Sequence, residues 1–205
     1  MNHVSQSSLA CPLIAALSFA VLAAGVSLGL TDALDAAARG AINSLASPQF
    51  TRVAFGASFL GSTAFLLVLT ASAALMLLAK FQRRSALMLI MVFTVAVITN
   101  NIVKLTFLRA RPEAFFGVLP ESYSFASGHA LLSACFYGAA AKILTADVCS
   151  KWRRAAVWLL ACGVIATIGL SRVYLGVHHL TDVLAGLCLG ALIVCVATTM
   201  FRPPA

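Results

Sequence analysis

Long stretches without any charged side chain constrain the fold of this chain more than any other feature. Residues 12–31, 53–79 and 85–103 contain no Asp, Glu, Lys or Arg. Each stretch is long enough to cross the hydrocarbon core of a bilayer, about 30 Å thick, as a helix. Inside that core a helix satisfies its own backbone hydrogen bonds. The sequence therefore predicts an all-α, polytopic membrane bundle.

Three further apolar runs bring the number of expected transmembrane helices to six. Residues 129–146 form the weakest run, because Lys142 interrupts it, whereas residues 155–171 and 183–201 are uncharged. We interpret residues 1–205 as a single membrane domain, since this length leaves no room for a second one.

The composition excludes several classes of protein. Hydrophobic residues make up 61% of the chain and charged residues 10%, with a mean hydropathy of +1.00. Charged residues make up about a quarter of a soluble domain. A soluble enzyme, a disordered tail and a DNA-binding domain are therefore excluded. The net charge of +8 is attributed to membrane orientation and lipid headgroups, and no nucleic-acid partner is expected.

The N-terminal segments are interpreted as one membrane helix followed by one interfacial helix. Residues 12–31 would also suit a signal peptide, but no Lys or Arg precedes Arg39, so the basic region of such a peptide is missing. In residues 32–49, Asp32 and Asp35 mix with apolar residues at helical spacing. That pattern predicts an amphipathic helix at the membrane interface.

Basic residues predict the orientation in the membrane. They gather after the second, fourth and sixth expected helices, a side that the positive-inside rule makes cytoplasmic. Both termini are then cytoplasmic, and the loops after helices one, three and five face outside. We expect a multi-pass cell-membrane protein, of the bacterial inner-membrane kind. The residues are Lys80, Arg83, Arg84, Lys151, Arg153, Arg154 and Arg202.

The six cysteines are interpreted as small core residues. No CxxC pair is present and most lie inside apolar runs, so we expect neither a disulfide framework nor a zinc site. They are Cys11, Cys135, Cys149, Cys162, Cys188 and Cys195.

Three clusters of polar residues lie at helix ends on the predicted outer side. They occupy residues 104–112, 126–129 and 171–182. Polar residues at membrane depth are costly, so such clusters indicate function. In a folded bundle these helix ends can converge.

The cationic and small residues of these clusters suit a phosphate group. Lys104, Arg111 and Arg172 are permanent positive charges, and two of them are planar donors. Ser127 could cap the helix that follows it, whose first N–H groups bind anions well. Gly128 would let the backbone approach a ligand closely.

The histidines suit nucleophilic and acid–base chemistry. His178 and Asp182 are four residues apart and share one face if the sixth helix begins near His178. A carboxylate beside an imidazole fixes its tautomer, which makes His178 a plausible nucleophile. His129 supplies a second imidazole, suited to general acid work near neutral pH.

Each cluster alone has a simpler interpretation. The basic residues also suit a solvated loop, Ser127 and Gly128 an ordinary turn, and the histidines interfacial hydrogen bonds to backbone. Asp182 also suits a helix-dipole partner. Because all three clusters lie on the same predicted face, we favour a phosphate site over these separate interpretations.

The three clusters together resemble the signature of a known family. The patterns are Lys104-x6-Arg111-Pro112, Ser127-Gly128-His129 and Ser171-Arg172-x5-His178-x3-Asp182. In order and internal spacing they resemble the type 2 phosphatidic acid phosphatase (PAP2) superfamily over residues 104–182. The six-helix layout extends the resemblance over most of the chain. The family usually has proline where this chain has Ala126, a change expected to loosen the loop.

The resemblance implies a role for each site residue. It implies that His178 attacks phosphorus and forms a phosphohistidine, and that Asp182 orients it. It implies that His129 protonates the leaving oxygen and then activates water, with His179 outside the chemistry. No metal or other cofactor is implied, since cationic side chains take the place of Mg²⁺. The implied phosphate-binding residues are Lys104, Arg111, Ser127, Gly128 and Arg172.

These expectations describe a membrane phosphatase acting on a lipid in the outer leaflet. Candidate substrates are polyprenyl pyrophosphate, phosphatidate, phosphatidylglycerol phosphate and lipid A phosphate, and a short outer loop favours the first. Alternatives are a lipid phosphotransferase, a vanadium-dependent haloperoxidase, which is typically larger and soluble, and a non-catalytic transporter. The oligomeric state stays open.

Three other features have packing interpretations. Gly186 and Gly190 form a GxxxG pattern that predicts close helix packing. Asn100, Asn101 and Tyr174 lie near the clusters, and the sequence leaves open whether they support the site or the packing.

Overall fold

The structure is a computed structural model that describes residues 6–116 and 119–201. Over these ranges all regular secondary structure is helical, as predicted. Arg202, used in the orientation argument, lies outside the described residues. The eight helices are α1 (Gln6–Ser27), α2 (Asp32–Asn43), α3 (Pro48–Leu60), α4 (Thr63–Ala79), α5 (Arg83–Phe107), α6 (Gly128–Leu144), α7 (Lys151–Tyr174) and α8 (Leu180–Met200).

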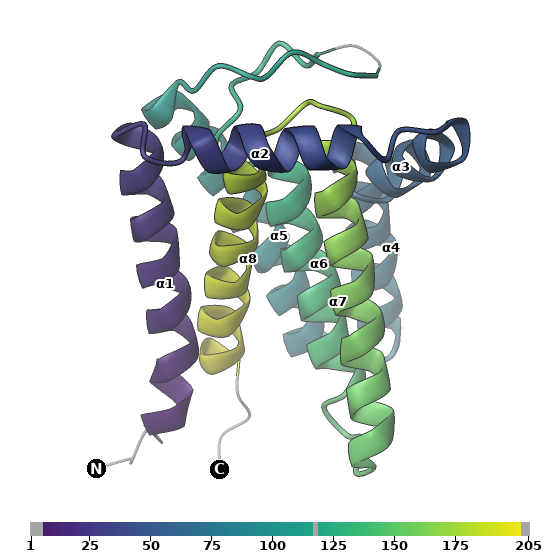
Figure 1. The fold of residues 1–205 in the computed structure, drawn as a ribbon. Coiled ribbons are helices and arrows are strands. Elements are labelled where there is room, and N and C mark those ends of the chain that lie inside the picture. The colour runs from purple at the N-terminus through teal and green to yellow at the C-terminus, as the bar shows by residue number, and fades with distance from the viewer. Residues whose placement is uncertain (1–5, 117–118, 202–205) are drawn as a thin grey trace.

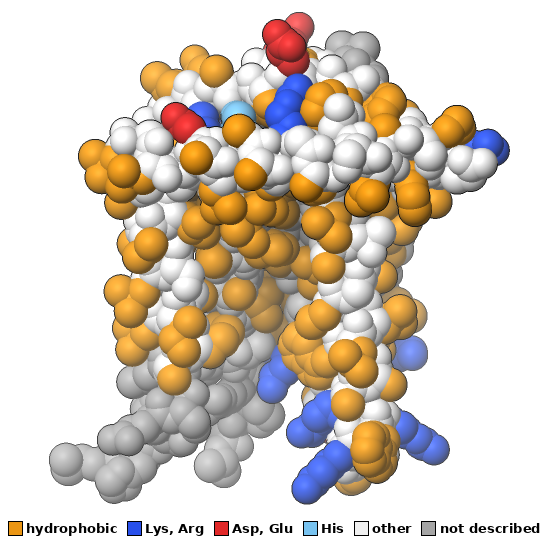
Figure 2. Space-filling view, viewed as in Figure 1, with side chains coloured by type: hydrophobic (Ala, Val, Ile, Leu, Met, Phe, Trp, Pro, Cys, Tyr) orange, Lys and Arg blue, Asp and Glu red, His pale blue; other side chains and the backbone are white. Residues whose placement is uncertain are grey.

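Most of the long helices run alongside one another, and α2 lies across one end of them (Figure 1). We call this the α2 end. Basic side chains gather at the opposite end, here called the basic end, while hydrophobic side chains cover the flanks between the two (Figure 2). The start of α1 and the end of α8 both lie at the basic end (Figure 1). Such apolar flanks suit lipid rather than water.

Helix α2 confirms the amphipathic helix expected in residues 32–49, but only over residues 32–43. Ile42 on its apolar side packs against residues of α7 and α8. Ser47 then caps α3 by accepting the backbone N–H of Phe50 at 3.2 Å, and Pro48 takes the first helical position. Pro suits that position because its missing N–H has no partner there anyway.

Helix α6 is the centre of the bundle and contacts α4, α5, α7 and α8. A Cβ atom added at Gly186 would lie 2.6 Å from the carbonyl oxygen of Ser127. One added at Gly190 would lie 2.5 Å from the Cβ of Ala134. The close packing predicted from the GxxxG pattern is therefore confirmed, with α6 as the partner of α8.

The expectation that residues 53–79 form one helix is wrong. The chain breaks at Gly61 and Ser62, and α3 and α4 meet at 48°. Ser62 caps α4 by accepting the N–H of Phe65, which starts a new helix there. A Cβ at Gly61 would overlap Ile168 of α7, so glycine is what lets α7 come close at the bend.

The described residues contain four helices long and apolar enough to cross a membrane, namely α1, α5, α7 and α8. Counting the bent pair α3–α4 as one span gives five. Helix α6, the weakest of the predicted spans, has 17 residues and is not among them.

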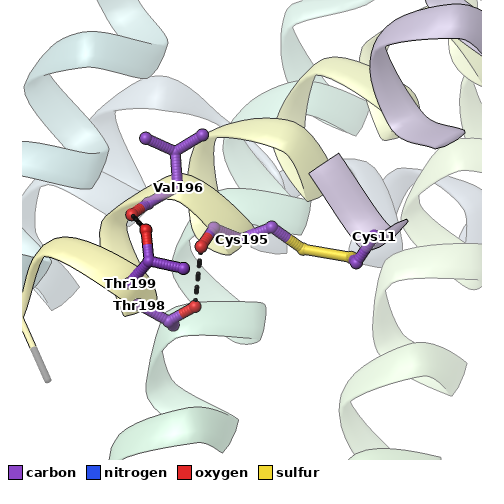
Figure 3. Close-up of a disulfide and its surroundings, with 5 residues drawn as sticks. All are labelled: Cys11, Cys195, Val196, Thr198 and Thr199. Carbon is purple, nitrogen blue, oxygen red and sulfur yellow. Dashed lines mark hydrogen bonds between the residues drawn. A yellow bond between two sulfur atoms is a disulfide. The ribbon is translucent and has the colours of Figure 1, made fainter. Parts of the chain in front are cut away.

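The cysteine interpretation is wrong for four of the six residues. Cys11 of α1 and Cys195 of α8 form a disulfide that joins the two helices (Figure 3). They lie 184 residues apart in the chain, so nothing local in the sequence indicates their pairing. Cys149 and Cys162 are exposed rather than buried in the core.

Candidate active site

The predicted site residues come together at the α2 end. Lys104 lies in the last turn of α5, and Arg111 lies in the loop that follows. The Nζ atom of Lys104 donates to Ser122 Oγ at 2.9 Å, and Nη2 of Arg111 donates to the same hydroxyl at 3.1 Å. Nη1 of Arg111 lies 3.1 Å from Nε2 of His178. One serine and one arginine thus connect the first cluster to the third.

The start of α6 joins this group through its backbone. The N–H of Ser127 donates to the carbonyl oxygen of Asp182 at 2.9 Å, which fixes the second cluster against the third. Arg172, in the last turn of α7, is buried and donates from Nη1 to Ser58 Oγ of α3. Four helix ends and the two loops between them therefore build the site.

His178 and Asp182 do not share a helix face, because α8 begins only at Leu180. Asp182 is the third residue of α8, and its carboxylate reaches back across the helix start. Its Oδ2 atom accepts the N–H of His179 at 2.9 Å and the hydroxyl of Ser124 at 2.5 Å. The same oxygen lies 3.4 Å from Nδ1 of His178. The imidazole and carboxylate meet as expected, but through a helix cap.

The surroundings of His178 assign its tautomer. A guanidinium only donates, so Nε2 accepts from Arg111 and the ring proton lies on Nδ1, facing Asp182. Burial lowers the pKa of His178 to about 4, although the carboxylate of Asp182 acts in the opposite direction. The imidazole is therefore neutral near pH 7, with a lone pair on Nε2.

Three buried polar atoms of the site and its neighbourhood lack partners. Ser127 Oγ, Arg172 Nε and Asn100 Oδ1 have no hydrogen-bond partner among the described residues. Buried polar groups are normally paired, so such atoms call for an explanation. A phosphate oxygen would accept from the hydroxyl of Ser127 and from the N–H of Arg172.

Ser127 occupies the cap position of α6, but its side chain makes no capping bond. The prediction of a side-chain cap is therefore wrong. This hydroxyl does not bond the first N–H groups of α6. The hydroxyl and these N–H groups therefore remain available to an anion. In the loop before Ser127, Ala126 is fully buried and Phe125 packs its ring against Phe107 and Phe19.

The two remaining histidines differ in their surroundings. His129, the second residue of α6, is half-buried beside the α3–α4 bend, close enough that a Cβ at Gly61 would lie 3.3 Å from its ring. His179 takes the cap position of α8, and the carboxylate of Asp182 accepts its backbone N–H at 2.9 Å. His179 thus serves the helix start.

Two of the three residues that the sequence left open, Tyr174 and Asn101, have contacts within or between helices. The hydroxyl of Tyr174 accepts the N–H of Ser47 at 3.2 Å and pairs with Thr51 Oγ1 at 2.9 Å, which ties α7 to α3. Asn101 donates to the carbonyl oxygen of Val97 in its own helix.

Sequence reasoning missed four residues that contact His178, Asp182 or their neighbours. The sequence assigned Arg109 no role beyond its place in residues 104–112, and it assigned Asp35 only a place in an amphipathic helix. The one signal available was an acidic residue placed among the apolar positions of residues 32–49. The four are Asp35, Arg109, Ser124 and Thr181.

Comparison with known proteins decides the family. The family model for the PAP2 superfamily matches residues 85–204. The chain belongs to the PAP2 superfamily. It is 32% identical over 183 residues to phosphatidylglycerophosphatase B of Bacillus subtilis, covering 89% of this chain and 90% of that protein. It is 33% identical over 124 residues to undecaprenyl-diphosphatase of Sulfolobus acidocaldarius, covering 58% and 56%.

Solved PAP2 structures share the fold. The crystal structure of the transmembrane PAP2 type phosphatidylglycerolphosphate phosphatase from Bacillus subtilis has a TM-score of 0.86 and 31% identity, over 93% of this chain and 95% of that one. Aquifex aeolicus LpxE has a TM-score of 0.59 at 22% identity, over 78% and 92%, a likeness of fold alone. This chain is a multi-pass membrane phosphatase of the PAP2 superfamily.

Proposed function

We propose that the protein hydrolyses a phosphate from a membrane lipid at the α2 end, through a phosphohistidine on His178. The observation that carries this proposal is the placement of the His178 imidazole, whose Nε2 lies 3.1 Å from Nη1 of Arg111 while Nδ1 faces Asp182. A phosphate that takes over the guanidinium as a partner frees the Nε2 lone pair for attack.

In the first step, Nε2 of His178 attacks phosphorus, the N–P bond forms and the bond to the leaving oxygen breaks. Lys104, Arg111 and Arg172 compensate the negative charge that spreads over the other phosphate oxygens. His129, which the negative charge of the bound phosphate keeps protonated, gives its proton to the leaving oxygen. Asp182 stabilises the positive charge that develops on the attacking ring.

In the second step, water attacks the phosphohistidine and the N–P bond breaks. His129, now neutral, takes a proton from that water. Inorganic phosphate leaves, and His178 returns to the neutral form with its proton on Nδ1. The same site would serve a phosphotransferase if a second lipid replaced the water.

Phosphatidylglycerol phosphate is the first candidate substrate and a polyprenyl pyrophosphate the second. The relative named phosphatidylglycerophosphatase B matches nearly the whole chain, whereas the relative named undecaprenyl-diphosphatase matches little more than half. A lipid substrate also suits the position of the site, where the interfacial helix α2 lies over a bundle with apolar flanks (Figures 1 and 2).

The test is phosphate release in detergent with EDTA. Four lipids are compared: phosphatidylglycerol phosphate, a polyprenyl pyrophosphate, phosphatidate and lipid A. The wild type should release phosphate from one of them and accumulate an acid-labile phosphoenzyme. His178→Ala should lose both signals. His179→Asn is the matched control, because asparagine also caps helices well, and it should keep both. A fully active His178→Ala variant would refute the mechanism, and phosphate transferred to a second lipid would identify a transferase.

We further propose six membrane crossings, with both termini cytoplasmic and the site on the periplasmic or extracellular side of a bacterial inner membrane. Helix α6 supplies the sixth crossing: its 17 residues span about 26 Å, and neighbouring helices surround it. The basic residues beside α4, α5 and α7 favour a cytoplasmic basic end.

Cysteine labelling tests this orientation. Cys149 is exposed in the loop between α6 and α7, at the basic end. In intact cells an impermeant maleimide should label an introduced Ser44→Cys at the α2 end and should label Cys149 only after the cells are opened. The opposite pattern would invert the proposed topology.

A further inference from the structure

Asp35 is a buried carboxylate on a helix that the proposed mechanism does not use. Although α2 lies across the end of the bundle, Asp35 is only 3% exposed. Its Oδ1 accepts the backbone N–H of Thr181 at 2.9 Å, and its Oδ2 accepts the hydroxyl of Thr181 at 2.7 Å. Thr181 is the second residue of α8, so Asp35 caps the start of α8 from another helix.

Arg109 connects this carboxylate to the catalytic one. Its Nη2 donates to Oδ2 of Asp35 at 2.8 Å, and its Nη1 donates to Oδ1 of Asp182 at 2.6 Å. The same Nη1 also lies 2.9 Å from the hydroxyl of Thr181. The planar guanidinium thus spans two carboxylates at once, a geometry that a lysine cannot reproduce.

The partners of Asp182 are divided between its two oxygens. Oδ2 holds Ser124, the N–H of His179 and the imidazole of His178, whereas Oδ1 holds Arg109. Without Arg109 all of these bonds would fall on one oxygen, and the carboxylate could rotate about its bond to Cβ. Arg109 therefore fixes the rotation that directs Oδ2 toward Nδ1 of His178.

We propose that Arg109 and Asp35 are positioning residues of the phosphatase, through which the docking of α2 on α8 sets the reactivity of His178. The inference rests on the proposed function, because it assigns these residues to the His178 reaction. Asp35 holds Arg109, Arg109 holds Asp182, and Asp182 holds the imidazole. Neither residue touches the phosphate, so the loss of either should slow the chemical step more than it weakens substrate binding.

The charges explain why the arginine requires both carboxylates. A buried guanidinium is costly unless its charge is compensated and its N–H groups are bonded. When Asp35 loses its charge, Arg109 keeps one full partner and can shift toward it. The bond to Oδ1 of Asp182 then changes direction, although the contact itself is not lost.

The experiment compares two acids of the same helix. Asp35→Asn removes the charge but keeps an oxygen for the N–H of Thr181. Asp32→Asn is the matched control, since Asp32 is 76% exposed and lies 4.0 Å from the same guanidinium. With the lipid that the wild type hydrolyses, Asp35→Asn should lower kcat about tenfold with KM within twofold, while Asp32→Asn matches the wild type.

A double-mutant cycle shows whether Asp35 acts through Arg109. Arg109→Gln should lower kcat by at least as much as Asp35→Asn, and adding Asp35→Asn to it should have little further effect. Equal activity of Asp35→Asn and Asp32→Asn overturns the inference. So does a full tenfold loss that persists in the Arg109→Gln background, or a loss that appears in KM alone.

Hydrogen exchange of the wild-type protein tests the Asp35 contact without turnover, and it does not depend on a variant that folds. In the wild type, the amide of Thr181 should exchange with solvent as slowly as amides inside α8, because Asp35 accepts its hydrogen. A Thr181 amide that exchanges at the rate of an open helix end overturns the inference. An inactive wild type with a protected Thr181 amide would instead overturn the proposed function.

Discussion

Gly186→Ala tests whether the contact between α6 and α8 holds the site together. The added Cβ would lie 2.6 Å from Ser127 O and 3.1 Å from Leu131 N, whereas ordinary contact begins at 3.4 Å. The two helices must separate by about 0.8 Å to relieve this. Overpacking of this kind costs about 1–3 kcal/mol, partly offset by a gain of up to about 1 kcal/mol from replacing a helical glycine.

The same separation should disturb catalysis. Ser127 N–H donates to Asp182 O across this contact, so the start of α6 and the carboxylate of Asp182 would move apart. A displacement near 1 Å costs up to about 100-fold in rate when reacting groups must be aligned. We expect Gly186→Ala to lower kcat at least tenfold and to lower the unfolding temperature in detergent.

Gly163→Ala is the matched control for this prediction. Gly163 lies in α7, is exposed, and a Cβ there would meet nothing within 4 Å. The control should keep full activity and unfold at the same or a higher temperature. If Gly186→Ala behaves like Gly163→Ala in both assays, close helix packing does not control the site and the reasoning is refuted.

Three further predictions concern pH, phosphate recognition and the disulfide. Because burial lowers the pKa of His178 to about 4, the acid limb of the kcat/KM profile should lie below pH 6.5, the ordinary pKa of histidine. For the same reason, the free energy of unfolding should fall as the pH drops from 6.5 toward 4. An acid limb at pH 6.5 would contradict a buried nucleophile. Arg172→Lys should raise KM about 10- to 100-fold, because it removes an Nε donor whose charged hydrogen bond contributes about 1.5–3 kcal/mol. An unchanged KM would show that Arg172 does not bind the phosphate. Alkylation of the unfolded chain without reductant should leave Cys11 and Cys195 unmodified, whereas prior reduction should expose both to the reagent; their modification without reductant would contradict the disulfide.

Much of the site could be predicted because its chemistry is recorded in residue types and spacing. The side chains of Lys104, Arg111 and Arg172 are cations whatever the fold, and few reasons exist to place them at helix ends in a membrane. The predicted convergence of the three clusters followed from helix count alone, since consecutive membrane helices alternate direction. The bend at Gly61 was missed, because an uncharged run satisfies the hydropathy argument whether it is one helix or two.

Errors of a second kind concern local geometry. Ser127 occupies the cap position that its residue type suggests, yet its hydroxyl makes no capping bond. His178 lies before α8 rather than on it, so its contact with Asp182 is made by a carboxylate reaching back from the third helical residue. Spacing of four residues suits both arrangements, and only the observed helix start separates them.

Charge, hydropathy and motif spacing are properties of residues along the chain, so they were sufficient to predict a helical membrane bundle and to propose a histidine site for phosphate. Tertiary structure alone decided that Asp35 and Arg109 join that site, that α8 packs on α6, and that Cys11 meets Cys195. Those contacts join residues far apart in sequence. Asp35 is 74 positions from Arg109 and 146 positions from Thr181. A single side chain carries no record of a partner that only folding brings within hydrogen-bond distance.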